Sequence, residues 1–195
     1  MAIADALDGA SRVSEIVRAM REFAHPALTE KTAIDVNRAI QSTITVARNE
    51  WKRVADVQTD LDSDLPLVPC LPAEFNQVIL NIILNAVDAI TDAVASTGGR
   101  GTITVTTRAL GRWAEIRIQD TGTGIPADIR DRVFDPFFTT KQVGRGTGQG
   151  LAIAHAVIVE KHGGTIAFET EPAKGTTFVV RLPIACEAVP RGTMP

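Results

Sequence analysis

Polar side chains interrupt the apolar segment QVILNIILNAVDAI at residues 77–90. Asn81 and Asn85 lie four residues apart, and Asp88 follows three residues later. On a helix, which turns about 100° per residue, these side chains and Gln77 fall along one narrow stripe. Asn is a poor helix former, whereas amide oxygens and carboxylates are hard ligands that suit Mg²⁺. The stripe therefore indicates either a solvated helix face or a magnesium and ligand site.

A second candidate is the aspartate that ends the alternating segment WAEIRIQD. Ile116 and Ile118 share one face of this expected strand, and Asp120 continues their phase, so its carboxylate should point to the buried side. A buried carboxylate needs hydrogen-bond donors. Asp120 either caps the following TGTG turn or accepts a hydrogen bond from a ligand amine, such as that of adenine. Gly122 and Gly124 would let the backbone approach a flat ring closely.

Thr176 raises the same question near the carboxyl end of the chain. In GTTFVVRLP it shares a face with Phe178 and Val180, so its hydroxyl should also be buried. The hydroxyl is satisfied either by its own strand or by a ligand.

Glycines occupy alternate positions ahead of an expected helix: Gly144, Gly146, Gly148 and Gly150. Consecutive backbone N–H groups and a helix N-terminus favour anions, and Lys141 and Arg145 add positive charge, so phosphate is the expected guest. The alternative is a flexible linker. The spacing matches neither the dinucleotide-binding nor the P-loop glycine pattern.

Helices and strands alternate in the order that positions these side chains. Periodicity predicts helices over residues 35–51, 73–95 and 151–161, and strands over 54–61, 102–108, 112–120, 165–170 and 176–183. The proline-rich stretch 62–72 is expected to be a connector. Together these elements predict an α/β sandwich, with a mixed, mostly antiparallel sheet and helices on one face.

Composition limits the classes of function. The chain has 195 residues, a hydrophobic fraction of 45% and a formal net charge of -3, which favours a globular domain without a nucleic-acid surface. Its two cysteines lack metal-ligand spacing. The first residues lack the apolar stretch of a signal peptide, and no uninterrupted run of about 18 apolar residues occurs, so we expect a cytoplasmic location.

Five ordered motifs resemble those of the ATP-binding catalytic domain of sensor histidine kinases, in the GHKL superfamily with its Bergerat-type fold. NIILNAVDA is similar to the N box, DTGTGIP to the G1 box, FDPFFTTK to the F box, GTGQGL to the G2 box and KGTTF to the G3 box. The FFTTK segment resembles the nitrogen-regulator-like branch. The superfamily also contains heat-shock chaperones, type II topoisomerases and mismatch-repair ATPases.

The resemblance implies a site for ATP and Mg²⁺. Asn85 would be the Mg²⁺ ligand, Asp120 the adenine anchor and Thr176 its supporting hydroxyl. The residues implied in ATP binding are Asn81, Asn85, Asp88, Asp120, Gly122, Gly124, Phe137, Lys141, Gly146, Thr147, Gly148, Gly150, Leu151 and Thr176. Lys141 and the glycines would form a lid over the phosphates, mobile without nucleotide, and Phe134, Phe137 and Phe138 would anchor its base.

The resemblance also implies what must come from elsewhere. The phosphoacceptor of the family is a histidine followed by an acidic residue, and none of His25, His155 and His162 lies in such a context. We therefore expect the phosphoacceptor helix, a response regulator and a second copy of the kinase as partners. Two alternatives are a nucleotide-sensing module without catalysis and a GHKL ATPase, for which Glu74 would be the catalytic carboxylate. A kinase that phosphorylates protein serine is a third.

We expect residues 1–27 to form the second helix of a dimerisation and phosphoacceptor domain, because apolar residues recur there at helical spacing. Residues 28–188 would form the ATP-binding domain, and residues 189–195 a frayed tail. The expected location is the cytoplasm, as a free protein or as the cytoplasmic part of a membrane-bound sensor.

Overall fold

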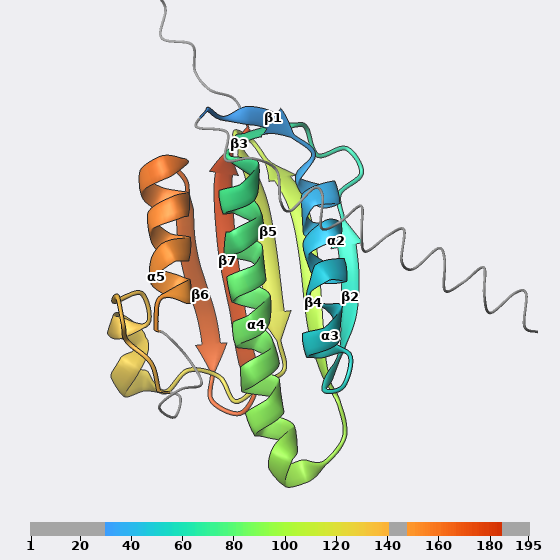
Figure 1. The fold of residues 1–195 in the computed structure, drawn as a ribbon, viewed down its shortest axis with the longest axis vertical. Coiled ribbons are helices and arrows are strands. Elements are labelled where there is room, and N and C mark those ends of the chain that lie inside the picture. Colours follow the sequence, from blue (N-terminus) through green and yellow to red (C-terminus); the bar gives the residue numbers. More distant parts are fainter. Residues whose placement is uncertain (1–29, 141–147, 185–195) are drawn as a thin grey trace, which may run out of the picture.

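A mixed five-stranded sheet carries a layer of helices in residues 30–140 and 148–184, the part of the chain that the computed structural model describes (Figure 1). The strands lie in the spatial order β2 (Ala55–Leu61), β4 (Gly101–Leu110), β5 (Trp113–Asp120), β7 (Gly175–Pro183) and β6 (Thr165–Glu171). β2 and β4 run parallel, and every other neighbouring pair is antiparallel. The predicted mixed, mostly antiparallel sheet is confirmed.

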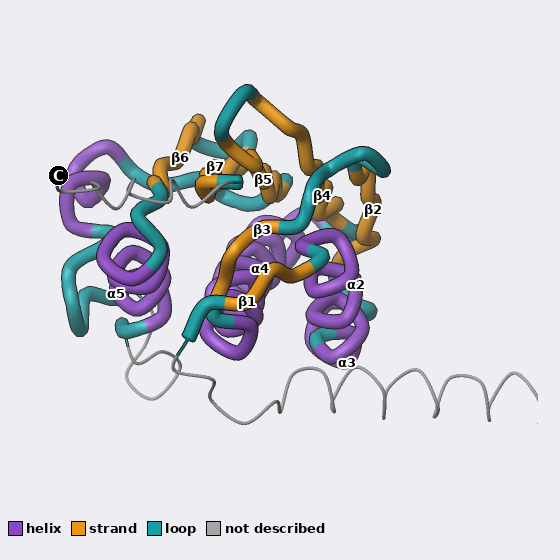
Figure 2. Tube along the Cα trace, turned by 90° about the horizontal axis from the view of Figure 1, so that it is seen from above, coloured by secondary structure: helices purple, strands orange, loops and turns teal. Residues whose placement is uncertain are grey.

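The helices lie on one face of this sheet, as Figure 2 shows from above. They are α2 (Val36–Val46), α3 (Arg48–Trp51), α4 (Pro72–Thr97) and α5 (Gly150–His155), which continues into the π-helical segment η2 (Ala156–Lys161). Gly163, with φ of 67°, follows the end of η2 and adopts the left-handed conformation that often ends a helix. The predicted α/β sandwich is therefore confirmed. The helix expected within residues 1–27 lies outside the described residues.

Helix α4 is the central helix of the core. Pro72 begins it, where a missing N–H has no cost, and Phe75, Ile79 and Ile82 are fully buried. By length and composition alone Pro72–Ala95 could cross a membrane, with a mean hydropathy of 1.7. In the fold its apolar side packs against the sheet, which is the burial that the core helix of a two-layer domain requires.

The alternating strands place apolar side chains under the helices. Ile103 and Val105 of β4 are fully buried, as is Ile116 of β5. In the β4–β5 register Ile103 lies opposite Asp120. The last inward position of β5 is therefore a carboxylate at the edge of the core, where the sequence predicted it.

Three local features differ from the sequence predictions. The stretch 62–72, expected to be only a connector, contains β3 (Val68–Cys70), which pairs with β1 (Thr32–Ile34) in a separate two-stranded sheet. Pro69 hides the strand in the sequence, but a proline is tolerated where no second neighbour needs its N–H. The helix predicted over 35–51 breaks at Ala47, and a 3₁₀ helix, η1 (Ala127–Arg132), follows β5.

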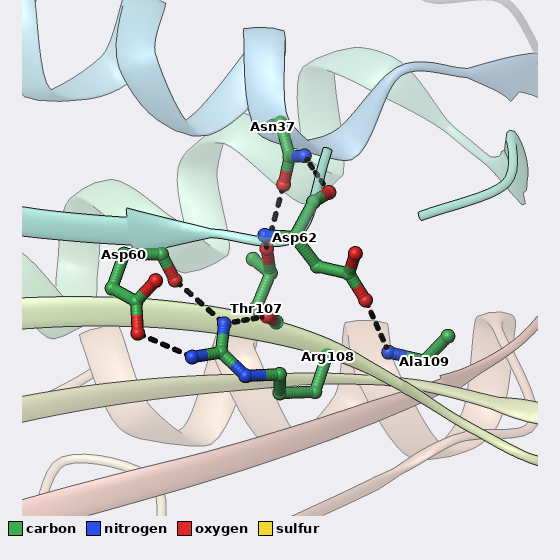
Figure 3. Close-up of polar contacts among 6 residues, drawn as sticks. All are labelled: Asn37, Asp60, Asp62, Thr107, Arg108 and Ala109. Atoms are coloured by element: carbon green, nitrogen blue, oxygen red, sulfur yellow. Dashed lines mark hydrogen bonds and ion pairs between the residues drawn. The ribbon is translucent and has the colours of Figure 1, made fainter. Parts of the chain in front are cut away.

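A polar network attaches α2 to the edge of the sheet (Figure 3). Asn37 Nδ2 donates to the carbonyl of Asp62 at 2.8 Å, and the buried Thr107 hydroxyl donates to Asn37 Oδ1 at 2.8 Å. The same hydroxyl accepts from the backbone N–H of Asp62 at 3.0 Å. Thr107 thus uses its donor and one acceptor position, which makes its burial between helix and sheet tolerable.

Candidate functional site

A cavity of about 370 Å³ opens beside the carboxyl-terminal half of α4. It brings together α4, the loop that follows β5, η1, the segment before residue 141 and the start of α5. Its lining residues are Asn81, Leu84, Asn85, Asp88, Ala89, Asp92, Asp120, Thr123, Gly124, Ile125, Pro126, Ile129, Val133, Phe138, Thr139, Thr140, Gly148, Gly150, Leu151 and Phe178. The volume falls within the range of small-molecule sites.

Asp120 is the buried carboxylate of this cavity, with 3% of its surface exposed. Its Oδ1 accepts hydrogen bonds from the backbone N–H groups of Gly122 at 2.8 Å and Thr176 at 3.3 Å. Burial raises the pKa of Asp120, and these two hydrogen bonds oppose the rise. Within the described part of the chain no donor is assigned to Oδ2, so the carboxylate retains an acceptor for a ligand.

The polar stripe of α4 faces the same cavity. Asn81, Asn85 and Asp88 all line it, whereas Gln77 is exposed and lies outside the lining. Asn81 Nδ2 donates to the carbonyl of Gly150 at 3.0 Å, which ties α4 to the first residue of α5. The stripe is thus not simply a solvated face, because tertiary structure encloses most of it.

Two glycines let the loop after β5 lie against its neighbours. Gly124 has φ of 72°, and a Cβ there would lie 2.3 Å from the carbonyl oxygen of Glu171. A Cβ on Gly122 would lie 2.6 Å from Ala89 of α4. Gly124 lines the cavity, whereas Gly122 acts from behind it through its N–H on Asp120. A third glycine of this kind, Gly175, was not singled out in the sequence.

Gly148, Gly150 and Leu151 lie on the side of the cavity where α5 begins. Gly148 has φ of 66°, and a Cβ there would lie 2.5 Å from the carbonyl carbon of Phe137. The backbone N–H groups that open a helix favour an anion. Lys141, Gly146 and Thr147, the other predicted phosphate contacts, lie outside the described residues.

The phenylalanines of the FDPFF segment have different environments. Phe138 lines the cavity, with the Arg132 guanidinium 4.4 Å from its ring centroid. Phe134 packs against the rings of His155 and Phe168, at centroid distances of 5.3 and 5.9 Å. Phe137 is 72% exposed at a positive φ of 65° and does not line the cavity. Its contact with ATP stays a prediction, and this geometry gives it no support.

Thr176 lies behind Asp120 and is absent from the cavity lining. Its N–H holds the carboxylate, and its hydroxyl lies 3.1 Å from that of Thr170, its cross-strand neighbour. Thr170 was not identified in the sequence, because nothing in the alternation of β6 distinguishes it from an ordinary strand threonine.

The apolar wall was also missed. Ile125, Ile129 and Val133 line the cavity together with Leu84 of α4. A flat ring needs such a wall, but isolated apolar residues in a loop carry no periodic signal. Asp92 was detectable in principle, because it lies four residues after Asp88 on the same stripe.

Oxygen donors on α4 suit a divalent cation. Asn85 and Asp88 line the cavity and carry amide and carboxylate oxygens, the ligand types that Mg²⁺ prefers. Among residues 30–140 and 148–184, no group of three His, Cys, Asp or Glu side chains is placed to hold a metal ion. The donor set fits Mg²⁺ held by one or two protein ligands plus phosphate oxygens, and does not fit a cage built by the protein alone.

Glu74, the candidate carboxylate of an ATPase, lies away from this cavity. It forms an ion pair with Lys161, with 2.8 Å between Oε1 and Nζ, and does not line the cavity. The structure therefore gives no support to the ATPase alternative through Glu74.

Comparison with known proteins agrees with the geometry. Residues 71–185 match the family described as histidine kinase-, DNA gyrase B- and HSP90-like ATPase. Sensor histidine kinase ZraS of Escherichia coli (strain K12) is 36% identical over 176 residues, which cover 90% of this chain and 36% of ZraS. Sensor kinase CckA of Brucella abortus (strain 2308) is 32% identical over 89% of this chain and 19% of CckA. The chain spans about a third or less of these relatives.

Solved structures share the fold. The catalytic domain of histidine kinase ThkA, at 28% identity, matches with a TM-score of 0.68 over 80% of this chain and 97% of that domain. Histidine kinase ThkA in complex with the response regulator TrrA matches at 24% identity with a TM-score of 0.63, over 92% of this chain and 49% of that one. The chain therefore belongs to the histidine kinase-, DNA gyrase B- and HSP90-like ATPase family, and its similarity in sequence and fold is to the ATP-binding catalytic domains of sensor histidine kinases.

Proposed function

We propose that this chain binds ATP with Mg²⁺ and transfers the γ-phosphoryl group to a histidine of a separate phosphoacceptor helix. The observation that carries the proposal is the cavity beside α4, which combines a buried carboxylate, an apolar wall and a polar helix stripe. Each part matches one part of ATP: the amine of the base, its flat ring and the phosphates.

At the base end, Asp120 accepts a hydrogen bond from the exocyclic amine of adenine. Its Oδ1 is fixed by two backbone N–H groups, so the carboxylate is oriented before the ligand arrives. The ring packs against the wall formed by Ile125, Ile129 and Val133. A buried acceptor selects a ligand with a matching donor, because an unmatched carboxylate keeps its desolvation penalty.

At the phosphate end, the start of α5 offers backbone N–H groups, and Lys141 is expected to add positive charge. Asn85, with Asp88 beside it, would hold Mg²⁺, which supplies charge neutralisation of the phosphate oxygens. Asn81 fixes the start of α5 relative to α4 through its hydrogen bond to Gly150.

The chemical step needs positioning more than covalent chemistry from this chain. A neutral imidazole nitrogen of the acceptor attacks the γ-phosphorus, the bond to the bridging β–γ oxygen breaks, and ADP leaves with that electron pair. The residues of the cavity hold ATP in line for this displacement and exclude water, which would otherwise take the phosphoryl group.

The same proposal includes partners and location. The phosphoacceptor helix is expected within a homodimeric kinase, and a response regulator would receive the phosphoryl group, in keeping with the ThkA–TrrA complex. The expected location is the cytoplasm, either free or as the cytoplasmic part of a membrane-bound sensor. The similarity to sensor kinases over a minor part of their length supports these expectations.

Titration of ATP by calorimetry tests the base contact. Asp120→Asn replaces an acceptor oxygen by a donor facing the adenine amine, so we expect an affinity loss of roughly tenfold to a hundredfold. Asp64→Asn makes the same chemical change at an exposed position outside the cavity and should leave the affinity unchanged. Equal affinities of wild type and Asp120→Asn would contradict the assignment of the cavity.

A further inference from the structure

Thr170 connects the apolar wall of the cavity to strand β7, behind Asp120, through a single hydroxyl group. It lies on β6, directly opposite Thr176 in the β6–β7 register. Its Oγ1 accepts from the backbone N–H of Ile125 at 2.9 Å and donates to the carbonyl of Gly175 at 3.1 Å. The third contact joins it to Oγ1 of Thr176 at 3.1 Å.

These contacts determine the direction of the hydroxyl pair. A threonine hydroxyl has one proton and two acceptor lone pairs. Because the N–H of Ile125 can only donate and the carbonyl of Gly175 can only accept, the Thr170 hydroxyl donates its one hydrogen bond to Gly175. The contact with Thr176 must then be donated by Thr176. The Thr176 proton points toward Thr170, and its lone pairs remain for other donors.

The direction of the Thr176 hydroxyl bears on the base end of the cavity because Thr176 also holds Asp120. The N–H of Thr176 donates to Asp120 Oδ1 at 3.3 Å. A Cβ on Gly175 would lie 1.9 Å from the carbonyl oxygen of Asp120, so the two strands are in close contact at this point. With the Thr176 proton held away, the Asp120 carboxylate and the Thr176 hydroxyl are both acceptors.

We propose that Thr170 is a positioning residue that keeps the Asp120 carboxylate and the Thr176 hydroxyl as acceptors only. In this way it sets selectivity for a 6-aminopurine nucleotide over a 6-oxopurine nucleotide. The proposal rests on the proposed ATP function. Adenine carries an amine, a donor, at the position where guanine carries a carbonyl oxygen, an acceptor. Without the lone pair of Thr170, the Thr176 proton loses its partner and is free to turn toward Asp120. Asp120 would then offer fewer acceptor positions to the amine of adenine and would repel the oxygen of guanine less.

Thr170 has a second, purely mechanical connection that provides a control. Arg130 Nε donates to the carbonyl of Ile125 at 3.2 Å, and its NH2 donates to the carbonyl of Thr170 at 3.4 Å. Arg130→Leu would loosen the same wall without changing the direction of either hydroxyl. Its effect should therefore be equal for ATP and GTP.

The test compares the dissociation constants of ATP and GTP for wild type, Thr170→Ser, Thr170→Val and Arg130→Leu. Thr170→Val keeps the shape but removes the hydroxyl, so we expect ATP affinity to fall roughly tenfold and the ATP/GTP affinity ratio to fall with it. Thr170→Ser should retain the wild-type ratio. An unchanged ratio in Thr170→Val, or a fall of the same size in Arg130→Leu, would overturn the proposal.

Two additional variants guard against misfolding and separate the two proposals. If Thr170→Val does not fold, as judged by circular dichroism, Thr170→Cys replaces the hydroxyl by a weak acceptor of similar size and should lower the ratio in the same direction. Asp120→Asn separates the two proposals. Loss of ATP binding in Asp120→Asn with no effect of Thr170 variants would overturn only the role of Thr170, whereas a wild type that binds no ATP would overturn the proposed function itself.

Discussion

Asp120 occupies a position that costs stability in the absence of a ligand. Burial raises its pKa above the value of 3.8 for a free side chain, so over the range above 3.8 the native protein binds more protons there than the unfolded chain does. The contribution of Asp120 to the free energy of unfolding therefore falls as pH rises through that range. A carboxylate whose burial is unfavourable for folding is a reasonable candidate for a functional group.

Gly124 and Gly163 share a left-handed backbone but differ in their surroundings. Their φ angles are 72° and 67°, yet a Cβ on Gly124 would lie 2.3 Å from the carbonyl oxygen of Glu171, whereas a Cβ on Gly163 would meet nothing within 4 Å. Gly163→Ala carries only the backbone penalty, about 1–2 kcal/mol. We expect Gly124→Ala to lower the free energy of unfolding by more, measured by urea denaturation, and also to weaken ATP binding.

Equal destabilisation by the two substitutions would show that the loop after β5 shifts without resistance. Gly163→Ala should retain the ATP affinity of wild type, because Gly163 lies at the end of η2 and outside the cavity lining.

At the scale of elements, His162 fastens the end of η2 to the beginning of α4. Its Nε2 accepts from the N–H of Leu71 at 2.9 Å, and Nδ1 lies 2.7 Å from the carbonyl of Val157. An acceptor at Nε2 requires the proton to be on Nδ1, so the ring is neutral. The neutral form agrees with the burial of the residue, of which only 2% is exposed.

Stability should depend on pH through His162. Burial lowers its pKa from 6.5, and Lys31 and Lys161 act in the same direction, whereas the hydrogen bond to Val157 and the charge of Glu74 oppose the shift. Below pH 6.5 the unfolded chain therefore binds the proton more readily, so the free energy of unfolding decreases as pH falls from 6.5 toward the lowered pKa.

The measurement is urea denaturation of wild type and His162→Gln across this pH range. Glutamine does not titrate, so the stability of wild type relative to the variant should rise with pH and level off above 6.5. A stability difference between wild type and variant that is constant with pH would mean that His162 is not held as a neutral imidazole in the native state.

At the scale of the whole molecule, the described part of the chain holds nucleotide-binding groups but offers no suitable phosphoacceptor. His162 is buried, and the His155 ring packs on Phe134. His25 lies outside the described residues. Incubated alone with γ-labelled ATP and Mg²⁺, the chain should therefore show little or no acid-labile phosphoprotein.

Supplying a phosphoacceptor helix should restore the label, and joining it covalently should make labelling much faster because the effective concentration rises. The product should be acid-labile and base-stable, as phosphohistidine is. Strong labelling of the isolated chain on one of its own histidines would contradict the prediction. Tight ATP binding without labelling of any supplied acceptor would favour the nucleotide-sensing module.

The sequence by itself determined the order of the main helices and of the strands of the five-stranded sheet, and the inward phase of Asp120 and Thr176. These properties are local, because side chains alternate along a strand and repeat every 3.6 residues along a helix. The polar stripe of Asn81, Asn85 and Asp88 could be read for the same reason. Such periodicity does not show which other segment packs against each face of a helix or strand.

Tertiary structure decided which segments meet. The hydroxyl of Thr170 bonds to Ile125, 45 residues away, and the amide of Asn81 bonds to Gly150, 69 residues away. Contacts between distant segments also form strand β3, the apolar wall of the cavity and the hydrogen bond between His162 and Leu71. No local pattern marks such contacts, because their free energy is gained only when the chain has folded and the groups have left water together.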